Sequence, residues 1–417
     1  MKKLLSLALL FVVSAIFSYT SNWSVCGAAT KSTTKDFSHP TVVYSPDQIA
    51  KLKAIIKKGD RKSVAYKSYK DLVSYPRASA SWKDYVGKIP FYIARDSGEK
   101  GQLDRSGNPY PFSFSKNATM VTQHLDAAYM SALLFALDVD NAKAHGAKSL
   151  AILSGYAKNV RMVCNTGNAP LMCGQAYHIA AAVALLKEYG CEGLTDEIYD
   201  SIVNDLLIGC FVPVLDFFFN APPYTNGNWG MCAILSYMAI AIVADNQEMY
   251  DFAINQYING KDNGTIYNYI DEKSGQCQET GRDQAHVQFG FSCAALICEI
   301  AYNQGDEYLY MENETALLTG LEYTAKLLLG EEVPYYVWTD ITGKYCRWKS
   351  IGTADPESGP SYNKCWSVAY NHYVNRLGKS MPNSLRLLEK NGWPSKYSSE
   401  GYWFDMFTFA PHPNDNK

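Results

Sequence analysis

Apolar residues recur at helical spacing along most of the chain. These patterns predict helices at residues 119–137, 141–163, 171–189, 195–219, 228–244, 247–259, 281–303 and 313–329, followed by 364–376 and 382–391. One stripe of this kind consists of Ala285, Phe289, Cys293, Leu296, Ile297 and Ile300. Nearer the amino terminus, Ser45-Pro46-Asp47-Gln48 is a typical helix start, and that helix is expected to end at Gly59.

Strand signals are scarce. One β-hairpin is predicted at 333–351, with its turn at Thr342-Gly343-Lys344, and the stretch from Trp82 to Phe114 is expected to be irregular. Consecutive helices without a βαβ rhythm favour an all-α fold of stacked helix pairs. Closed into a ring, such pairs form an α/α toroid, an incomplete barrel of about six or seven helical hairpins. An open solenoid is the alternative, but no repeat of fixed period is visible.

The amino terminus has the pattern of a secretory signal. Lys2 and Lys3 precede an apolar run from Leu4 to Phe17, and small residues at 27–29 offer a cleavage point. We therefore expect a signal peptide at 1–29, a single domain at 30–417, and a periplasmic or secreted protein. Cys26 could instead carry a lipid anchor. No later run is expected to span a membrane.

Charge and cysteine usage narrow the function further. A net charge of -3 gives the protein no overall positive electrostatic field that would attract nucleic acid. The 31 Tyr and 8 Trp suit a groove whose aromatic rings stack on sugar rings. No CxxC or HExxH motif supports a zinc site, so neither a metal nor another cofactor is expected. Cysteines within apolar helical runs are predicted to be buried, namely Cys210, Cys232, Cys293 and Cys298. Disulfides could join Cys164 to Cys173 and Cys346 to Cys365.

The stretch from Gln278 to Gly290 is rich in polar side chains and leads into an apolar helix. Thr280 and Asp283 have capping-box spacing, which predicts a helix start at about Gly281. Arg282 and His286 are four residues apart and share one helix face. A guanidinium and an imidazole beside free helix N–H groups favour an acidic ligand. The plainer interpretation is that Arg282 pairs with Glu279 or Asp283, and that His286 is a satisfied interior residue.

Polar residues also begin other predicted helices. In a toroid the inner helices point the same end towards one opening, so these residues would converge on a single cleft. They are Gln123 and His124, then Gln175, Tyr177 and His178, then Asn226, Asn228 and Trp229, and finally Arg282 and His286.

The second half of the chain carries five ordered sequence blocks, namely Asn226–Trp229, Asn259–Gly264, Gln276–His286, Leu321–Lys326 and Tyr370–Arg376. Together they resemble the alginate lyase superfamily of bacterial polysaccharide lyases, and the resemblance covers roughly residues 80–380. The resemblance implies an α/α toroid, export to the periplasm, and cleavage of a uronate polysaccharide by β-elimination, with alginate as the first expected substrate. Better-known members have a histidine where this chain has Trp229, and a tyrosine near the position of Phe289. This difference leaves the base and the acid to be assigned to other residues.

β-Elimination removes the C5 proton of a uronate and expels the 4-linked oxygen. The charge that builds on the carboxylate needs donors, and a His or Tyr must take the proton. We therefore hypothesise that Asn228 and Arg282 hold the carboxylate, that His286 is the base or a carboxylate donor, and that Tyr370, or else Tyr177, is the acid. Sugar subsites are assigned to Gln123, His124, Tyr177, His178, Trp229, His372 and Arg376.

Two other function classes remain open at this point. A glycoside hydrolase would use two carboxylates, for which Glu279 and Asp283 are the nearest candidates. A non-catalytic glycan-binding protein would suit a lipid anchor on Cys26. In each case the partner is an acidic polysaccharide, with no nucleic acid, and the protein is expected to be a monomer.

Overall fold

The computed structural model describes residues 36–97, 113–164, 169–220, 225–312, 314–344, 347–352 and 364–391. They all lie in one compact unit, Asp36–Lys417. The predicted signal peptide, Cys26, Cys346 and the side chain of Cys365 lie outside the described residues.

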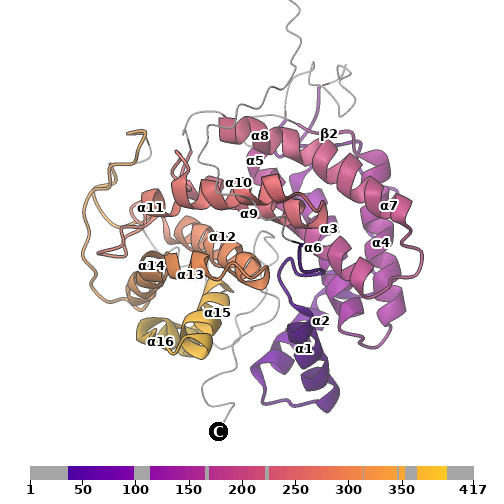
Figure 1. Cartoon of the computed structure of the whole chain (residues 1–417), viewed down its shortest axis with the longest axis horizontal. Helices are drawn as coiled ribbons and strands as arrows, with labels where there is room; N and C mark the ends of the chain where they lie inside the picture. The colour runs from indigo at the N-terminus through magenta and orange to yellow at the C-terminus, as the bar shows by residue number, and fades with distance from the viewer. Residues whose placement is uncertain are drawn as a thin grey trace, which may run out of the picture. The chain divides into compact units, whose positions relative to one another are not determined.

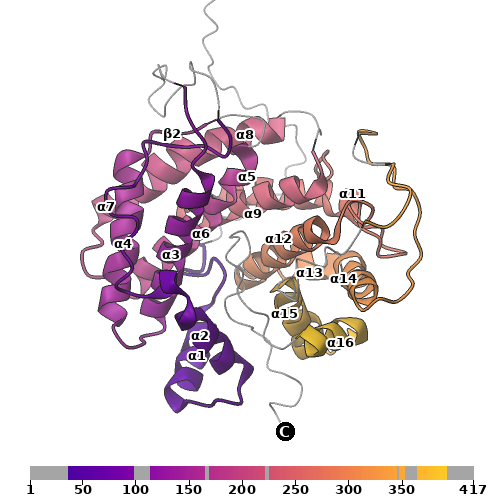
Figure 2. The same cartoon turned by 180° about the vertical axis from the view of Figure 1, so that it is seen from behind.

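The helices form two rows (Figures 1 and 2). Each member of the inner row contacts the next, in the order α3 (Ala118–Ala136), α6 (Gln175–Glu188), α9 (Gly227–Val243), α12 (Gln284–Asn303) and α15 (Lys364–Tyr370). Each also contacts an outer partner, respectively α4 (Ala142–Asn159), the π-helix η2 (Ser201–Phe211), α10 (Gln247–Asn259), α14 (Glu314–Leu328) and α16 (Pro382–Asn391). This succession of helix pairs is the predicted α/α toroid.

Shorter elements complete the description. They are the hairpin of α1 (Pro46–Lys58) and α2 (Val64–Ser74), then η1 (Pro76–Ala78), α5 (Ala169–Cys173), α7 (Asp196–Asp200), α8 (Val212–Asn220), α11 (Ile266–Tyr269), α13 (Tyr308–Glu312) and η4 (Asn371–Arg376). Ser45 caps α1 in a complete capping box and Gly59 ends it, as predicted. Two short strands, β1 (Tyr92–Ile93) and β2 (Met162–Val163), pair in parallel.

The inner helices are apolar on nearly every side, because neighbours cover them all round. Three stretches, Ala169–Glu188, Asp196–Asn220 and Gln284–Asn303, are long and apolar enough, by length and composition, to cross a membrane; the second contains η2 of the outer row, and 56% of its apolar window is buried. The expectation that no run after the leader would qualify was wrong. Within the protein, 100% of the apolar window of the first stretch and 83% of that of the third are buried.

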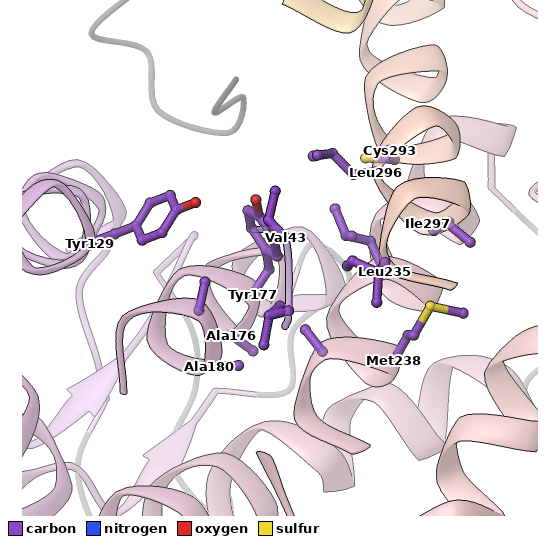
Figure 3. Packing of buried hydrophobic residues seen from close by; sticks show 14 of the residues in the cluster. Val43, Tyr129, Ala176, Tyr177, Ala180, Leu235, Met238, Cys293, Leu296 and Ile297 are labelled. Carbon is purple, nitrogen blue, oxygen red and sulfur yellow. The ribbon is translucent and has the colours of Figure 1, made fainter. Parts of the chain in front are cut away.

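The segment before α1 packs into the middle of this core. Val43 is 2% exposed, and Figure 3 shows it among side chains of the inner helices. The end of α12 holds the segment in place, since Asn303 donates to the Val43 carbonyl at 2.7 Å and Gln304 donates to the Thr41 carbonyl at 2.8 Å. Residues 41–43, just before α1, are therefore tied to the carboxyl end of α12.

Three local predictions were wrong. Helix α12 begins at Gln284, three residues later than expected, because Asp283 and not Thr280 accepts the capping hydrogen bond, from the His286 N–H. No strand forms in the described part of 333–351; the Gln276 side chain bonds the N–H and carbonyl of Tyr336, which a hairpin would have used, although the turn at Gly343 is present.

The third concerns the cysteines. Cys164 and Cys173 are both free and buried. They belong to separate apolar clusters, since Cys164 packs with Ala94, Phe114 and Met162 and Cys173 packs in the main core. Cys210, Cys232, Cys293 and Cys298 are buried, as predicted.

Candidate active site

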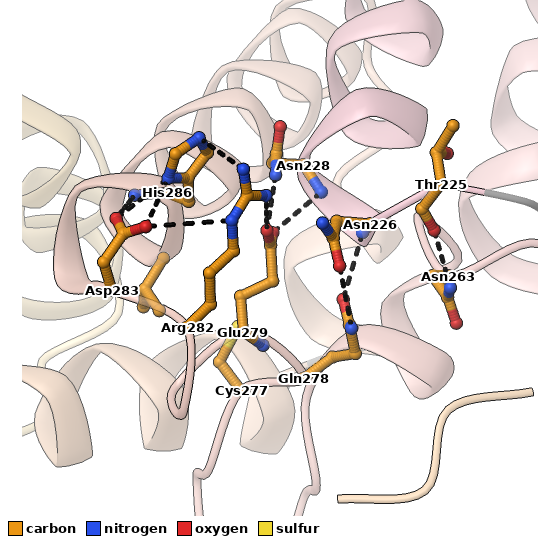
Figure 4. A network of polar contacts seen from close by, with 12 residues as sticks. Thr225, Asn226, Asn228, Asn263, Cys277, Gln278, Glu279, Arg282, Asp283 and His286 are labelled. Carbon is orange, nitrogen blue, oxygen red and sulfur yellow. Dashed lines mark hydrogen bonds and ion pairs between the residues drawn. The ribbon is translucent and has the colours of Figure 1, made fainter. Parts of the chain in front are cut away.

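Two glycines bring the start of α9 against the connection between α10 and α12. A Cβ on Gly264 would lie 2.5 Å from the Cα of Gly230, so only residues without side chains permit this approach. Asn263 stabilises the same contact, because its side-chain amide donates to the Thr225 carbonyl at 2.7 Å. The polar residues that precede α12 are thereby placed beside the first turn of α9 (Figure 4).

Glu279 is the centre of the polar cluster that results. Its side chain is 0% exposed, and its two carboxylate oxygens accept four hydrogen bonds. Asn228 donates through Nδ2 at 2.6 Å and through its backbone N–H at 3.1 Å. Tyr269 donates at 3.1 Å and Arg282 Nη1 at 2.8 Å. A buried carboxylate is tolerated only when it is paired and bonded in this way.

Arg282, His286 and Asp283 continue the network. The Arg282 Nη2 lies 2.9 Å from His286 Nε2, and His286 Nδ1 lies 2.7 Å from Asp283 Oδ2. A guanidinium can only donate, so Nε2 accepts; an ionised carboxylate can only accept, so Nδ1 carries the hydrogen. The imidazole is therefore neutral, with its proton on Nδ1.

These three side chains form the accessible edge of the cluster. Arg282 is 27% exposed, Asp283 28% and His286 38%, in contrast to the enclosed Glu279. Burial raises the pKa of Asp283, but the hydrogen bonds from His286 and the Arg282 charge outweigh burial and hold that pKa below its usual value. Asp283 thus stays ionised and orients the imidazole.

Asn228 uses part of its side-chain amide inside the cluster. Nδ2 donates one hydrogen to Glu279, and the amide turns its Oδ1 the other way, where that buried oxygen has no hydrogen-bond partner. The second Nδ2 hydrogen and Oδ1 are the groups that Asn228 retains for a ligand. The prediction that Asn228, Arg282 and His286 share one site agrees with the geometry, and the donor role of Asn228 towards a carboxylate stays a prediction.

Tyr370 lies away from this cluster. Burial raises the pKa of Tyr370, and so do the nearby charges of Glu389 on α16 and Glu322 on α14. The ring therefore lies near carboxylates of the outer row. Tyr177 is 1% exposed and packs its ring 6.0 Å from that of Tyr129. Tyr370 is therefore not placed beside His286, and its assignment as acid is corrected; the assignment of the enclosed Tyr177 stays a prediction.

His372 and Arg376 also lie elsewhere. Arg376 makes a two-pronged ion pair with Glu299, at 2.7 and 2.8 Å, and the His372 ring stacks 3.7 Å from the Tyr310 ring. Glu299 lies about 20 Å further along α12 than His286, at about 1.5 Å per residue. These two residues join helices together and do not form subsites at the cluster.

The remaining predicted subsite residues divide into buried and partly exposed ones. His124 is 0% exposed and bonds the Tyr156 hydroxyl at 2.9 Å; His178 is 1% exposed and bonds Gln175 at 3.1 Å. Burial lowers the pKa of His124 to about 4 and that of His178 to about 3, so both are neutral interior residues. Gln123 and Trp229 are half-buried at the starts of α3 and α9 and keep some surface for a ligand.

Sequence reasoning missed Tyr269 and understated Glu279. Tyr269 is a fully buried donor whose pKa burial raises well above its usual value, so it remains protonated behind Glu279. Nothing in its sequence context marks it as part of the cluster. Glu279 was foreseen only as a possible partner of Arg282 or a hydrolase carboxylate. Within the described residues, no group of three or more His, Cys, Asp or Glu side chains is placed to hold a metal ion.

Comparisons with known proteins find alginate lyases. The alginate lyase family model matches residues 215–333, which carry the whole cluster. A variant of alginate lyase A1-III, solved with a tetrasaccharide, shares the fold at 13% identity with a TM-score of 0.55, over 91% of this chain and 98% of that one. An alginate lyase from Bacteroides ovatus is 11% identical with a TM-score of 0.49, over 85% and 99%. No curated protein sequence matches the chain.

The paired-helix toroid carries an Asn, Arg and His cluster at the start of α9 and around the start of α12. The family match falls on the segment that carries the cluster. Over residues 215–333 the chain is similar to the alginate lyase family, and it shares the fold of alginate lyase A1-III.

Proposed function

We propose that the protein cleaves a 4-linked uronate polysaccharide by β-elimination, giving 4,5-unsaturated products, with alginate the first substrate to test. The observation that carries this proposal is the accessible pair of Arg282 and His286. A cation that can neutralise a uronate carboxylate lies 2.9 Å from an imidazole whose other nitrogen is held by a carboxylate. Proton removal next to a carboxylate needs these two functions side by side.

Arg282 supplies the charge. Each terminal nitrogen of a guanidinium carries two N–H groups, and Arg282 uses one on Nη1 for Glu279 and one on Nη2 for His286. A carboxylate that accepts from both terminal nitrogens therefore competes with His286 for Nη2. Glu279 holds the group in place from the buried side.

His286 is the base. Its Nε2 takes the C5 proton, the electron pair of that C–H bond forms the C4–C5 double bond, and the C4–O bond breaks. The imidazolium so formed is stabilised by ionised Asp283, 2.7 Å away. It then returns a proton to the expelled oxygen or loses it to solvent while that oxygen is protonated by water.

The hydrolase alternative fits the cluster less well. A glycoside hydrolase needs one carboxyl that reaches the leaving oxygen and a second on the other side of the bond. Glu279 is fully buried under four donors, and Asp283 is engaged with His286. Neither carboxylate is free to approach a glycosidic oxygen.

The test is to incubate the purified mature chain with alginate, glucuronan, polygalacturonate and a neutral glucan, while recording ultraviolet absorbance and product size. A lyase produces shorter chains that absorb through the new conjugated double bond. Shorter chains without absorbance would indicate a hydrolase, and binding without shortening would indicate a glycan-binding protein; either outcome contradicts the proposal.

We further propose that the protein acts outside the cytoplasm, on the evidence of the apolar run after Lys2 and Lys3. Sequencing the amino terminus of the protein recovered from its native cells tests this. A start shortly after residue 29 is expected, and an intact Met1 would contradict it.

A further inference from the structure

Arg282 and His286 are bonded to each other, and this contact occupies the atom that the reaction needs. Nδ1 holds its hydrogen against Asp283, so Nε2 is the only basic atom of the imidazole. The guanidinium donates directly to the Nε2 lone pair at 2.9 Å. While that contact persists, Nε2 cannot accept the C5 proton.

We propose that Arg282 masks the base until a free substrate carboxylate draws it away, which makes the enzyme selective for free uronates over their esters. This inference rests on the proposed function and deepens it. In it, Arg282 has two roles at one site, neutralising the substrate carboxylate and keeping His286 inactive in its absence. The substrate class is therefore the un-esterified polyuronate.

The difference between a carboxylate and an ester follows from hydrogen-bond strength. A carboxylate forms charged, two-pronged hydrogen bonds with a guanidinium, roughly twice as strong as neutral ones. It can therefore compete with the neutral Nε2 for the Nη2 donor. A methyl ester has no net charge and offers only a carbonyl acceptor, so Arg282 remains on His286.

The anchor at the other end of the guanidinium allows this movement. Nη1 stays on Glu279 at 2.8 Å, whereas the Nε contact with Asp283 is long, at 3.7 Å. A small rotation about the Nη1 anchor is enough to take Nη2 off the imidazole. Glu279 is itself held by Asn228 and Tyr269, so the pivot does not move with the substrate.

Chemical reactivity alone predicts the opposite preference. The C5 proton beside an ester is more acidic than the one beside a carboxylate, so an enzyme with an unmasked base would eliminate the ester readily. Rejection of the ester by the native enzyme, together with its rescue when Arg282 is removed, would therefore be specific to the mask.

The experiment compares a polyuronate that the enzyme cleaves with its methyl ester, following ultraviolet absorbance for the native enzyme and Arg282→Ala. The native enzyme should favour the free acid by about 100-fold or more. Arg282→Ala should lose about 100-fold or more on the free acid, yet exceed the native rate on the ester by about tenfold. Arg386→Ala serves as the matched control, because Arg386 is an exposed arginine on α16 that pairs with Glu331.

Arg282→Ala leaves buried Glu279 without its cation, so this variant is at risk of misfolding. A second variant keeps the test interpretable in that case. Arg282→Lys keeps a charge for Glu279, but a single ammonium cannot reproduce the fork that reaches both Glu279 and His286. Its ratio of ester rate to acid rate should rise by about tenfold over the native ratio.

The outcomes separate the two proposals. One outcome is that the native enzyme cleaves free uronates while Arg282→Ala shows no higher rate on the ester and Arg282→Lys no higher ratio of ester rate to acid rate. That result would reject the masking role of Arg282 and leave the lyase function supported. If the native enzyme cleaves no uronate at all, both proposals fail.

Discussion

At the scale of residues, the site depends on which hydrogen-bonding capacities are already used. Glu279 accepts one Nδ2 hydrogen of Asn228, which leaves that side chain its second Nδ2 hydrogen and Oδ1 for a ligand. Asp283 accepts the hydrogen on Nδ1 of His286, so Nε2 is the basic atom of the imidazole. The sequence could name Asn228, Arg282 and His286 because their residue types suit uronate chemistry. It could not assign their roles, which depend on the direction in which each amide and ring is turned.

Asp283→Asn tests the orientation of the imidazole. Asparagine caps a helix about as well as aspartate, so the free energy of unfolding should fall by less than about 1 kcal/mol. The amide can donate to Nδ1, which would move the imidazole hydrogen to Nε2 and remove the base. We expect kcat to fall by about two orders of magnitude or more, with KM little changed. A kcat within about threefold of the native value would show that Asp283 acts only as a cap.

At the scale of elements, helix positions could be predicted and their connections could not. The apolar stripes placed α3, α9, α10 and α16 within one residue at each end, because burial against neighbours follows the 3.6-residue period. The hairpin predicted at 333–351 does not form because its backbone groups bond to side chains outside that range, such as those of Gln276 and Tyr323. Such pairings leave no local pattern.

Gly264→Ala tests the close contact between the start of α9 and the connection before α12. The added Cβ would meet Gly230 backbone at 2.5 Å, so the two segments must move apart. We expect the free energy of unfolding in urea to fall by about 1–3 kcal/mol. We also expect a loss of activity beyond the loss of folded protein, because the cluster spans this contact. An unchanged stability would mean that the contact is not tight.

Arg376→Met tests whether Arg376 joins helices or binds substrate. Removing one partner leaves Glu299 charged and 1% exposed, which should lower the free energy of unfolding by about 3–5 kcal/mol. The double variant with Glu299→Leu should recover part of this loss. The activity per folded molecule should stay within about twofold. A large rise in KM with normal stability would restore the subsite assignment.

At the scale of the whole molecule, four buried histidines couple stability to pH. Burial lowers the pKa from 6.5 to about 4 for His124 and His145, and to about 3 for His178 and His372. The unfolded chain therefore binds protons below pH 6.5 that the folded chain rejects. Their contribution to stability is complete above pH 6.5 and is lost as pH falls towards 4.

We expect each histidine to contribute up to about 1.4 kcal/mol per pH unit within that window. Urea unfolding at pH 7.5, 6 and 5 measures the slope, and His124→Asn should reduce it by about one histidine's share. A stability that is constant or rises towards pH 5 would contradict the assignment of these residues as neutral interior groups.

The account of function depends on Arg282 as the group that stabilises the charge developing on a uronate. The most direct measurement is the initial rate of ultraviolet-absorbing product from the polyuronate that the native enzyme cleaves best, compared between the native enzyme and folded Arg282→Ala. The account predicts a loss in kcat/KM of at least about 100-fold. A rate within about threefold of the native enzyme would contradict it.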